Sequence, residues 1–454
     1  MRSLRNVALS LAATSAMALS IVGAPTGAGA TTDGVTHDTG TLPNGTVWIA
    51  DIPAQWNGTL LLYSHGFGPL TAQDAPDPAT AAALLARGYA LAGSSYDPSG
   101  SMWALDTAVS DQFGTLRAVE SGALPARPRR VIAVGTSMGG LISAIEAQDG
   151  AGAIDGALTT CGIVAGAINL NNYQLDGEYA LAQLLLPGQN VQLTGFTTTS
   201  AALATAAELQ AAATTAQQTA AGRARLALAL ALLNASPGSV GAPLTPAELE
   251  AGQFQVEFTG SFSTLDFIES GRPSIDAASG GSASWTAGTD FGAVLLRSPY
   301  LPDVATMYHA AGLSLGGDLT DLTQHATITA DPAAVRSLRE TSVPTGRLAV
   351  PELDLHTIAD QLVPVQQENF YRARVQAAGS ASLLRQAYVA SVGHCNFSSA
   401  ELVAGVQAIG TRIATGHWGN VASTKHLEQV AEGLNLGPAR FVDYEPGQLT
   451  GATR

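Results

Sequence analysis

The pentapeptide GTSMG at residues 135–139 and the segments on either side of it constrain the fold of this chain more than any other feature. Residues 130–134 are mostly β-formers, and residues 141–148 (LISAIEAQ) carry apolar side chains at helical spacing. The pattern predicts a strand, a sharp turn and a helix, with Ser137 at the turn. Such a turn lifts a serine hydroxyl clear of the backbone, where a base can remove its proton. A chance match is the alternative in a chain with 49 glycines, but the order of strand, turn and helix favours a nucleophile.

Two later segments supply the acid and the base that a serine nucleophile needs. In an arrangement of this kind they follow the serine in the order Asp, His. Asp360 lies in the polar turn of LHTIADQLVP, after the apolar stretch 348–355. His394 follows a Val- and Ala-rich segment in AYVASVGHCNF, residues 387–397. We therefore predict that Ser137, Asp360 and His394 form a catalytic triad.

Two neighbouring residues compete for the same roles. His356 lies four residues before Asp360, and we expect it to shape the acid loop from the end of a strand rather than to act as the base. Asp354 is the rival acid. Because it alternates with Leu353 and Leu355, we expect it inside a strand, from which a carboxylate cannot easily reach a histidine on a loop.

Two backbone amides are candidates for an oxyanion hole. Acyl transfer builds negative charge on the carbonyl oxygen, and N–H groups held in place beforehand stabilise that charge. Met138 follows the nucleophile and would donate one amide. The segment LLLYSHGFG, residues 60–68, is expected to end a strand in a glycine-flanked loop, where Phe67 would donate the second amide and His65 would hold the shape of the loop. An ordinary strand-to-loop turn is the alternative for HGFG taken alone.

Together the segments GTSMGG, HGFG, HTIADQLVP and GHCNF resemble those of the α/β-hydrolase superfamily, and they cover both ends of the mature chain. The resemblance implies an α/β fold with a mostly parallel, doubly wound sheet and helices on both of its faces. It also implies Ser137, Asp360 and His394 as the triad, with Phe67 and Met138 as oxyanion donors. HGFG is similar to the loop of the lipase and esterase type.

The GHC segment also resembles tannase-like and feruloyl-esterase-like members of the superfamily. In those proteins a cysteine beside the catalytic histidine is bridged to a cysteine immediately before the serine. This chain has Thr136 before Ser137, so the bridge cannot form in the same way.

The two cysteines, Cys161 and Cys395, favour a disulfide because an even number of cysteines is typical of bridged exported proteins. Cys161 ends the apolar segment 154–160, which is expected to be the strand after the nucleophile helix. The carboxyl ends of such strands gather at the ligand crevice, where Cys395 adjoins His394. Two buried free thiols are the alternative.

Residues 1–30 have the organisation of a cleavable signal peptide. Arg2 and Arg5 precede an apolar stretch at residues 7–22, and the small residues AGA end the segment, with cleavage expected after Ala30. The apolar stretch is interrupted by hydroxyl side chains and is shorter than the roughly 18 residues of a membrane span. We therefore predict a secreted protein with no stable membrane anchor.

Charge and composition narrow the class of partner. The formal charge is −15, and it becomes −17 once Arg2 and Arg5 are removed with the signal peptide. A protein with this net negative charge is not expected to attract nucleic acid or an anionic membrane. No CxxC or His/Cys cluster suggests a metal, so we expect no metal and no cofactor, only a small-molecule or polymeric ester as the substrate.

The length of 454 residues exceeds that of an ordinary α/β domain, which predicts a core with an insertion. We place the catalytic core at residues 31–165 and 345–454, and a largely helical cap at residues 166–344. Within the cap, the Ala- and Leu-rich residues 201–234 predict a packed helical pair. The cap phenylalanines could line a pocket or form the core of the cap itself: Phe254, Phe258, Phe262 and Phe267.

These features favour a secreted serine hydrolase that cleaves carboxylic esters through an acyl-enzyme intermediate. A peptidase or amidase of the same fold is the alternative, because a triad does not distinguish an ester from an amide. A non-catalytic secreted binding protein is a third hypothesis, but it would be expected to lack a member of the triad.

Overall fold

The computed structural model of the chain describes residues 30–32, 34–260 and 263–451. The predicted signal peptide, apart from its last residue, and Phe262 lie outside these ranges. Among the helices in the described ranges, none is both long and apolar enough to cross a membrane.

The described part of the chain forms one ten-stranded sheet in the order β1-β2-β3-β5-β4-β6-β7-β8-β9-β10. The strands β4 to β9 run parallel to their neighbours in this order, whereas β1, β2, β3 and β10 join antiparallel at the two sides. The prediction of a mostly parallel sheet is therefore confirmed. The strands are β1 (Ala30–Thr32), β2 (Val35–Thr41), β3 (Val47–Pro53), β4 (Thr59–Ser64), β5 (Ala90–Ser94), β6 (Arg130–Thr136), β7 (Gly156–Thr160), β8 (Glu352–Ala359), β9 (Leu384–Val392) and β10 (Phe441–Val442).

The central strands are apolar because both faces of the sheet are covered. Every residue of β4 is buried, as is typical of a parallel strand between two helical layers. Leu60 and Leu62 belong to the core on one face, and Leu61 and Tyr63 belong to the core on the other, as the alternation of side chains along a strand requires. The sheet is therefore doubly wound, as the resemblance implied.

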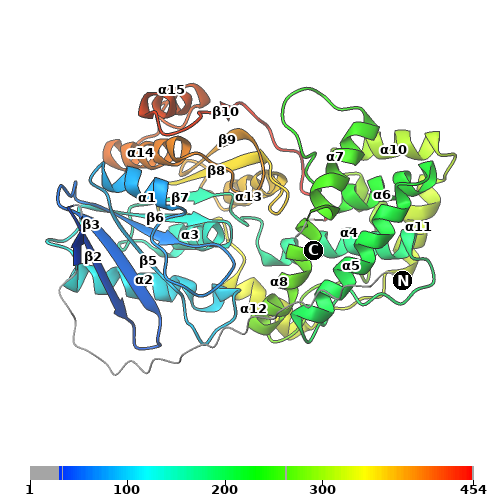
Figure 1. The fold of residues 1–454 in the computed structure, drawn as a ribbon, viewed down its shortest axis with the longest axis horizontal. Coiled ribbons are helices and arrows are strands. Elements are labelled where there is room, and N and C mark those ends of the chain that lie inside the picture. Colours follow the sequence, from blue (N-terminus) through cyan, green and yellow to red (C-terminus); the bar gives the residue numbers. More distant parts are fainter. Residues whose placement is uncertain (1–29, 33, 261–262, 452–454) are drawn as a thin grey trace, which may run out of the picture.

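Helices from both ends of the chain cover the sheet. One face packs against α1 (Pro78–Leu85), α14 (Ser399–Thr415) and α15 (Thr424–Leu434), and the opposite face packs against α2 (Ala108–Gly122), α3 (Met138–Asp149) and α13 (Gln366–Ala377). Figure 1 shows α14 and α15 on one side of the sheet and α2 on the other. This arrangement confirms the α/β fold class.

A helical insertion at residues 167–341 separates β7 from β8 and forms its own body beside the sheet (Figure 1). It has a hydrophobic core of its own, in which residues 226–233 of α6 are buried all round. The predicted helical pair corresponds to α5 and α6. The helices are α4 (Ala167–Leu185), α5 (Thr199–Ala216), α6 (Ala220–Leu233), α7 (Pro246–Phe258), α8 (Thr264–Ser279), α9 (Phe291–Leu295), α10 (Leu301–Ala310), α11 (Leu315–His325) and α12 (Pro332–Thr341).

Two sets of hydrogen bonds tie the helical insertion to the sheet. The Trp103 amide, which follows β5, donates to Ser274 Oγ on α8, and its indole N–H donates to Ser342 Oγ after α12, both at 3.1 Å. The C-terminal segment reaches the insertion at Asn234, which exchanges two hydrogen bonds with the backbone of Thr450, at 2.8 and 3.2 Å.

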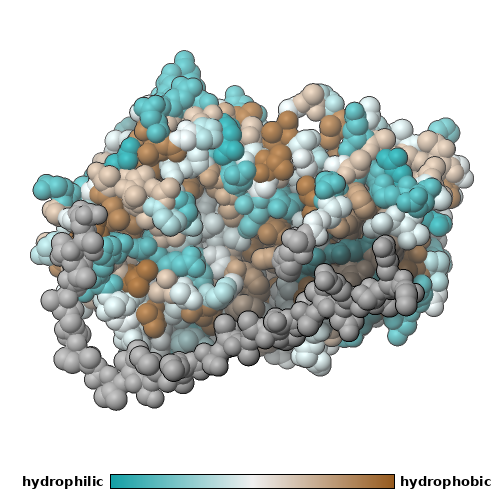
Figure 2. Space-filling model, in the orientation of Figure 1, coloured by the Kyte–Doolittle hydropathy of each residue, from teal (hydrophilic) through white to brown (hydrophobic). Residues whose placement is uncertain are grey.

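The face of the molecule in Figure 2 shows hydrophobic residues scattered among hydrophilic ones, both over the sheet with its helices and over the helical insertion.

Candidate active site

Ser137 occupies a strained turn between β6 and α3. Its φ of 61° and ψ of −120° are unusual for a residue with a side chain, as expected for a serine at a strand-to-helix elbow. The elbow needs glycine on both sides. A Cβ at Gly135 would lie 1.9 Å from the Gly139 carbonyl oxygen, and a Cβ at Gly139 would lie 1.8 Å from the Ser64 carbonyl oxygen. This turn at the carboxyl end of a central parallel strand is the elbow of the α/β-hydrolase fold.

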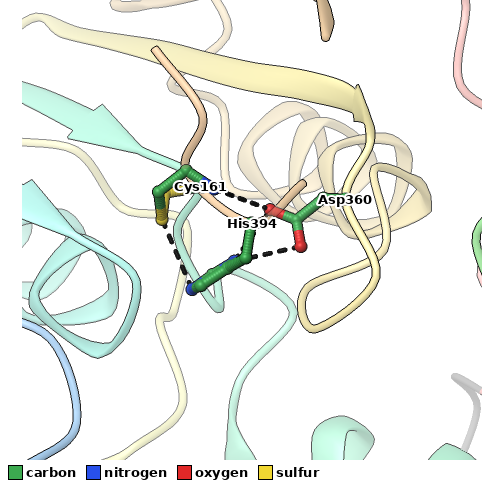
Figure 3. A group of neighbouring side chains, drawn as sticks. Cys161, Asp360 and His394 are labelled. Carbon is green, nitrogen blue, oxygen red and sulfur yellow. Dashed lines mark hydrogen bonds and ion pairs between the residues drawn. A yellow bond between two sulfur atoms is a disulfide. The ribbon is translucent and has the colours of Figure 1, made fainter. Parts of the chain in front are cut away.

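Asp360 and His394 reach Ser137 from the loops after β8 and β9, two adjacent strands that β7 separates from β6. Asp360 directly follows β8, and His394 follows β9 after Gly393. Because these parallel strands end at the same edge of the sheet, their loops meet beside Ser137. His394 Nε2 lies 2.8 Å from Ser137 Oγ. On the other side of the ring, His394 Nδ1 lies 2.8 and 3.0 Å from the two Asp360 oxygens, and Figure 3 shows this pair beside Cys161. The structure thus brings the three predicted residues into one hydrogen-bonded chain.

The acid loop holds Asp360 in its ionised form. The amides of Leu362 and Val363 both donate to Asp360 Oδ1 at 2.9 Å. Burial alone would raise the pKa of Asp360, but the charge and the hydrogen bond of His394, followed by the charge of His356, hold that pKa below its ordinary value. Asp360 is therefore a carboxylate at neutral pH and accepts a hydrogen bond from His394 Nδ1–H.

The rival acid, Asp354, lies inside β8 as expected and is fully buried. Burial, together with the nearby Glu352 and Glu368, raises the pKa of Asp354 well above its ordinary value. Its surroundings thus disfavour the charged form of Asp354, whereas those of Asp360 favour the charged form.

A disulfide joins Cys161, which directly follows β7, to Cys395, which directly follows His394. This is the predicted pairing. It differs from the tannase-like bridge, because it begins after β7 and not beside Ser137. Cys395 Sγ lies 3.3 Å from His394 Nε2, so the bridge contacts the imidazole as well as anchoring its loop to the sheet.

The disulfide also bears on metal binding at this site. Ligand atoms of Cys161, Asp360, His394 and Cys395 lie within 4.8 Å of one another. Cysteine binds metals as a thiolate, however, and both sulfur atoms here are bonded to each other. The cluster therefore does not fit a thiolate metal site.

Both candidate oxyanion segments lie beside Ser137. Met138 is the first residue of α3, where backbone N–H groups have no acceptor within the helix. A Cβ at Gly66 would lie 3.3 Å from Ser137 Cβ, which places the loop before Phe67 against the nucleophile. His65 stacks on Tyr96 with ring centroids 4.3 Å apart, and the Tyr96 hydroxyl donates to the His65 carbonyl oxygen at 2.9 Å. These contacts fix the loop.

A cavity of about 50 Å³ opens over Ser137 and His394. The polar side chains of the lining are those of Ser137, Gln174 and His394. The other lining residues are apolar or, at Gly271, have no side chain. The lining residues are Phe67, Trp103, Ser137, Ile163, Leu170, Gln174, Phe267, Ile268, Gly271, Ile275, Leu362 and His394.

The helical insertion supplies one wall of this cavity through α8. Phe267 of α8 meets Phe67 edge to face, with centroids 5.9 Å apart. On the same helix, Arg272 forms a buried ion pair with Glu178 of α4. Of the other phenylalanines considered from the sequence, Phe254 and Phe258 pack against each other away from the cavity lining.

Sequence reasoning missed several residues of this site. Gln174 and Leu170 lie on α4, and Ile163 lies just before it, in segments without a recognised motif. The sequence carries no signal for them, because the polar residues of α4, among them Asn169 and Asn172, suggest an exposed helix, whereas the structure buries this helix all round. His356 was expected at a strand end, whereas the structure places it inside β8, fully buried.

No protein-family model matches the chain. The chain is 27% identical over 433 residues to o-phthalyl amidase from Xanthobacter agilis, a match that covers 90% of this chain and 94% of that protein. Among solved structures, an esterase from Aspergillus oryzae matches with a TM-score of 0.40 and 14% identity, over 83% of this chain and 80% of that chain. The rice cell wall degrading esterase LipA from Xanthomonas oryzae matches with a TM-score of 0.36 and 15% identity, over 84% of this chain and 89% of that chain.

Proposed function

We propose that this chain is a serine hydrolase that cleaves a carboxylic acyl bond through an acyl-enzyme intermediate. One observation carries the proposal: His394 Nε2 lies 2.8 Å from the hydroxyl of a serine held in a strained elbow, with ionised Asp360 behind the imidazole. A base that is hydrogen-bonded to the nucleophile and oriented by an acid is the arrangement that activates a serine.

In this reaction Ser137 Oγ attacks the acyl carbon while His394 Nε2 takes the hydroxyl proton. Asp360 stabilises the imidazolium that forms. The amides of Phe67 and Met138 are proposed to hold the oxyanion. His394 then returns the proton to the leaving group, and a water molecule activated in the same way releases the acid and restores Ser137.

The cavity favours an uncharged, flat acyl group. Phe67, Trp103 and Phe267 supply aromatic surface, and no charged side chain other than the triad lines the cavity in the described part of the chain. A carboxylic ester of such an acid is the first candidate substrate. The 27% identity to an o-phthalyl amidase favours an aromatic amide as the second candidate.

Location and partners form part of the same proposal. We propose that residues 1–30 direct export and that the helical insertion acts as the cap over the site. The disulfide supports export, because such bonds persist in oxidising compartments. The proposed substrate is a small or polymeric ester, with no cofactor, no nucleic-acid partner and no stable membrane anchor.

A matched ester and amide test the proposal. We expect the mature protein to hydrolyse p-nitrophenyl benzoate and to react with a fluorophosphonate probe. We expect Ser137→Ala to do neither. Comparison of kcat/KM for the benzoate with that for N-(4-nitrophenyl)benzamide decides between an esterase and an amidase. Hydrolysis that persists unchanged in Ser137→Ala would exclude the proposed nucleophile.

Gln174 is expected to determine preference for acyl groups that carry a hydrogen-bonding substituent. Its amide is the polar side chain that the cavity presents in addition to Ser137 and His394. In Gln174→Leu, we expect kcat/KM for p-nitrophenyl acetylbenzoates to fall about 3- to 10-fold relative to the unsubstituted benzoate. The unsubstituted ester is the internal control. An equal decrease for all of these esters would mean that Gln174 only maintains the shape of the cavity.

A further inference from the structure

We propose that His356 is a positioning residue, buried as an imidazolium between Asp360 and Glu368, which keeps Asp360 ionised and in place beneath His394. This inference rests on the proposed function, because Asp360 and His394 are assigned their roles only there. It concerns a residue outside the triad that touches neither the serine nor the cavity.

The hydrogen bonds of His356 place a proton on both ring nitrogens. Nε2 lies 2.8 Å from the carbonyl oxygen of Val363, which can only accept, so Nε2 carries a hydrogen. Nδ1 lies 2.8 Å from Glu368 Oε1. If Glu368 is a carboxylate, it too can only accept, and the imidazole is then doubly protonated and positively charged.

Glu368 has a second hydrogen-bond donor besides His356. Its other carboxyl oxygen accepts a hydrogen bond from the side-chain amide of Gln386 on β9. Glu368 also lies in the first turn of α13, where the helix dipole favours negative charge. Burial alone would lower the pKa of His356, but the hydrogen bond and charge of Glu368, with the charge of Asp360, raise it above its ordinary value.

The imidazolium acts on Asp360 in two ways. Nε2 lies 3.9 Å from Asp360 Oδ2, close enough for its charge to oppose protonation of that carboxylate. The same nitrogen also binds the carbonyl oxygen of Val363, whose amide donates to Asp360 Oδ1. His356 thus holds the acid loop on one side of the carboxylate while His394 binds the other side.

Other ionisable groups surround this cluster, but among the residues that the structure describes only His394 joins His356 in placing a positive charge near Asp360. Burial raises the pKa of Asp354 well above its ordinary value and raises the pKa of Glu352 to about 7, so both carboxyl groups are shifted towards their neutral forms. The neighbouring tyrosines are neutral because burial raises the pKa of each one: Tyr173 of α4, Tyr371 of α13 and Tyr388 of β9. Without His356, Asp360 and Glu368 would be two buried carboxylates in one site.

The charge state can be measured without any assay of activity. In the full mature chain with ¹⁵N-labelled histidine, the His356 ring resonances are assigned by their loss in His356→Gln. We expect both ring nitrogens to have the shifts of protonated nitrogen from pH 6 to pH 8. One unprotonated ring nitrogen at pH 7 would overturn the inference, even if the protein proves to have no hydrolase activity.

The effect on catalysis is measured as a pH profile of kcat/KM. In His356→Gln, the uncompensated charge of Glu368 makes Asp360 and His394 bind protons more readily. We expect the acid limb to move about 1 unit towards higher pH, which is about a 10-fold loss at pH 6 on top of any loss at pH 8. In the double variant His356→Gln/Glu368→Gln, which restores neutrality, the limb returns towards its wild-type position.

The controls separate a positioning role from a structural one. Tyr371→Phe removes a buried hydrogen bond to Glu352 in the same layer, and it should leave the acid limb in place. A uniform loss of kcat at every pH in His356→Gln, with no return in the double variant, would overturn the positioning role. Absence of Ser137-dependent hydrolysis in the wild-type protein would instead contradict the proposed function, and the ring resonances would still decide the charge of His356.

Discussion

Ser137→Ala and His394→Ala are each expected to lower kcat by about 10⁵- to 10⁶-fold, and the double variant is expected to be no slower than either single variant. The physical reason is the 2.8 Å contact between Ser137 Oγ and His394 Nε2. Because the imidazole activates that one hydroxyl, loss of either partner removes the same step. The residual rate comes from binding in the cavity and from the backbone amides, which neither substitution removes.

A matched serine provides the control. Ser143 is a buried serine of α3 whose hydroxyl bonds Gly140 and Thr159 but does not contact His394. Ser143→Ala should retain kcat within a few fold, and thermal unfolding should show that all four variants fold. Losses that multiply in the double variant would mean that Ser137 and His394 act independently, contrary to the proposed mechanism.

Cys161→Ala/Cys395→Ala is expected to lower the free energy of unfolding by about 2–5 kcal/mol. The bridge closes a loop between residues 234 positions apart, and loop closure restricts the unfolded chain more as the loop grows. We also expect a lower kcat, because the bridge anchors the loop of His394 and its sulfur contacts the imidazole. Chemical denaturation of the wild-type and variant proteins, with and without reductant, measures the first effect.

The reductant separates the disulfide from the side-chain substitutions. It should destabilise the wild-type protein to nearly the level of the variant and leave the variant unchanged. If the wild-type protein exposes two titratable thiols after reduction but unfolds at the same denaturant concentration, the bridge does not contribute to stability as proposed.

Much of the site was predictable because its parts are local signals. Ser137 could be found from a strand, a glycine-flanked turn and a helix within about twenty residues, and Asp360 and His394 each follow an apolar segment of their own. The ends of parallel strands converge, so three such signals in the correct order imply proximity. The disulfide followed by the same reasoning, since each cysteine adjoins one of these strand ends.

The start of β8 shows where this reasoning failed. The apolar stretch 348–355 indicated the strand, but β8 begins at Glu352 and continues to Ala359. Glu352 is fully buried, with hydrogen bonds from Thr159 and from Tyr371, which lie 193 and 19 positions away in the sequence. A buried carboxyl group with distant partners resembles a loop residue in the sequence, so the buried polar layer that includes His356 could not be recognised.

The sequence by itself determined the elbow and the order of the nucleophile, acid and base, because short-range patterns of glycine and apolar residues specify turns and strands. The mostly parallel sheet was implied by the resemblance to the α/β-hydrolase superfamily. Only the tertiary structure decided which side chains of the helical insertion line the cavity and what surrounds Asp360. Gln174 and Phe267 come to line the same cavity as Ser137 only when α4 and α8 pack beside the sheet, and His356 meets Glu368 when α13 packs near β8. Such contacts depend on how separate elements pack, and no local pattern along the chain encodes that packing.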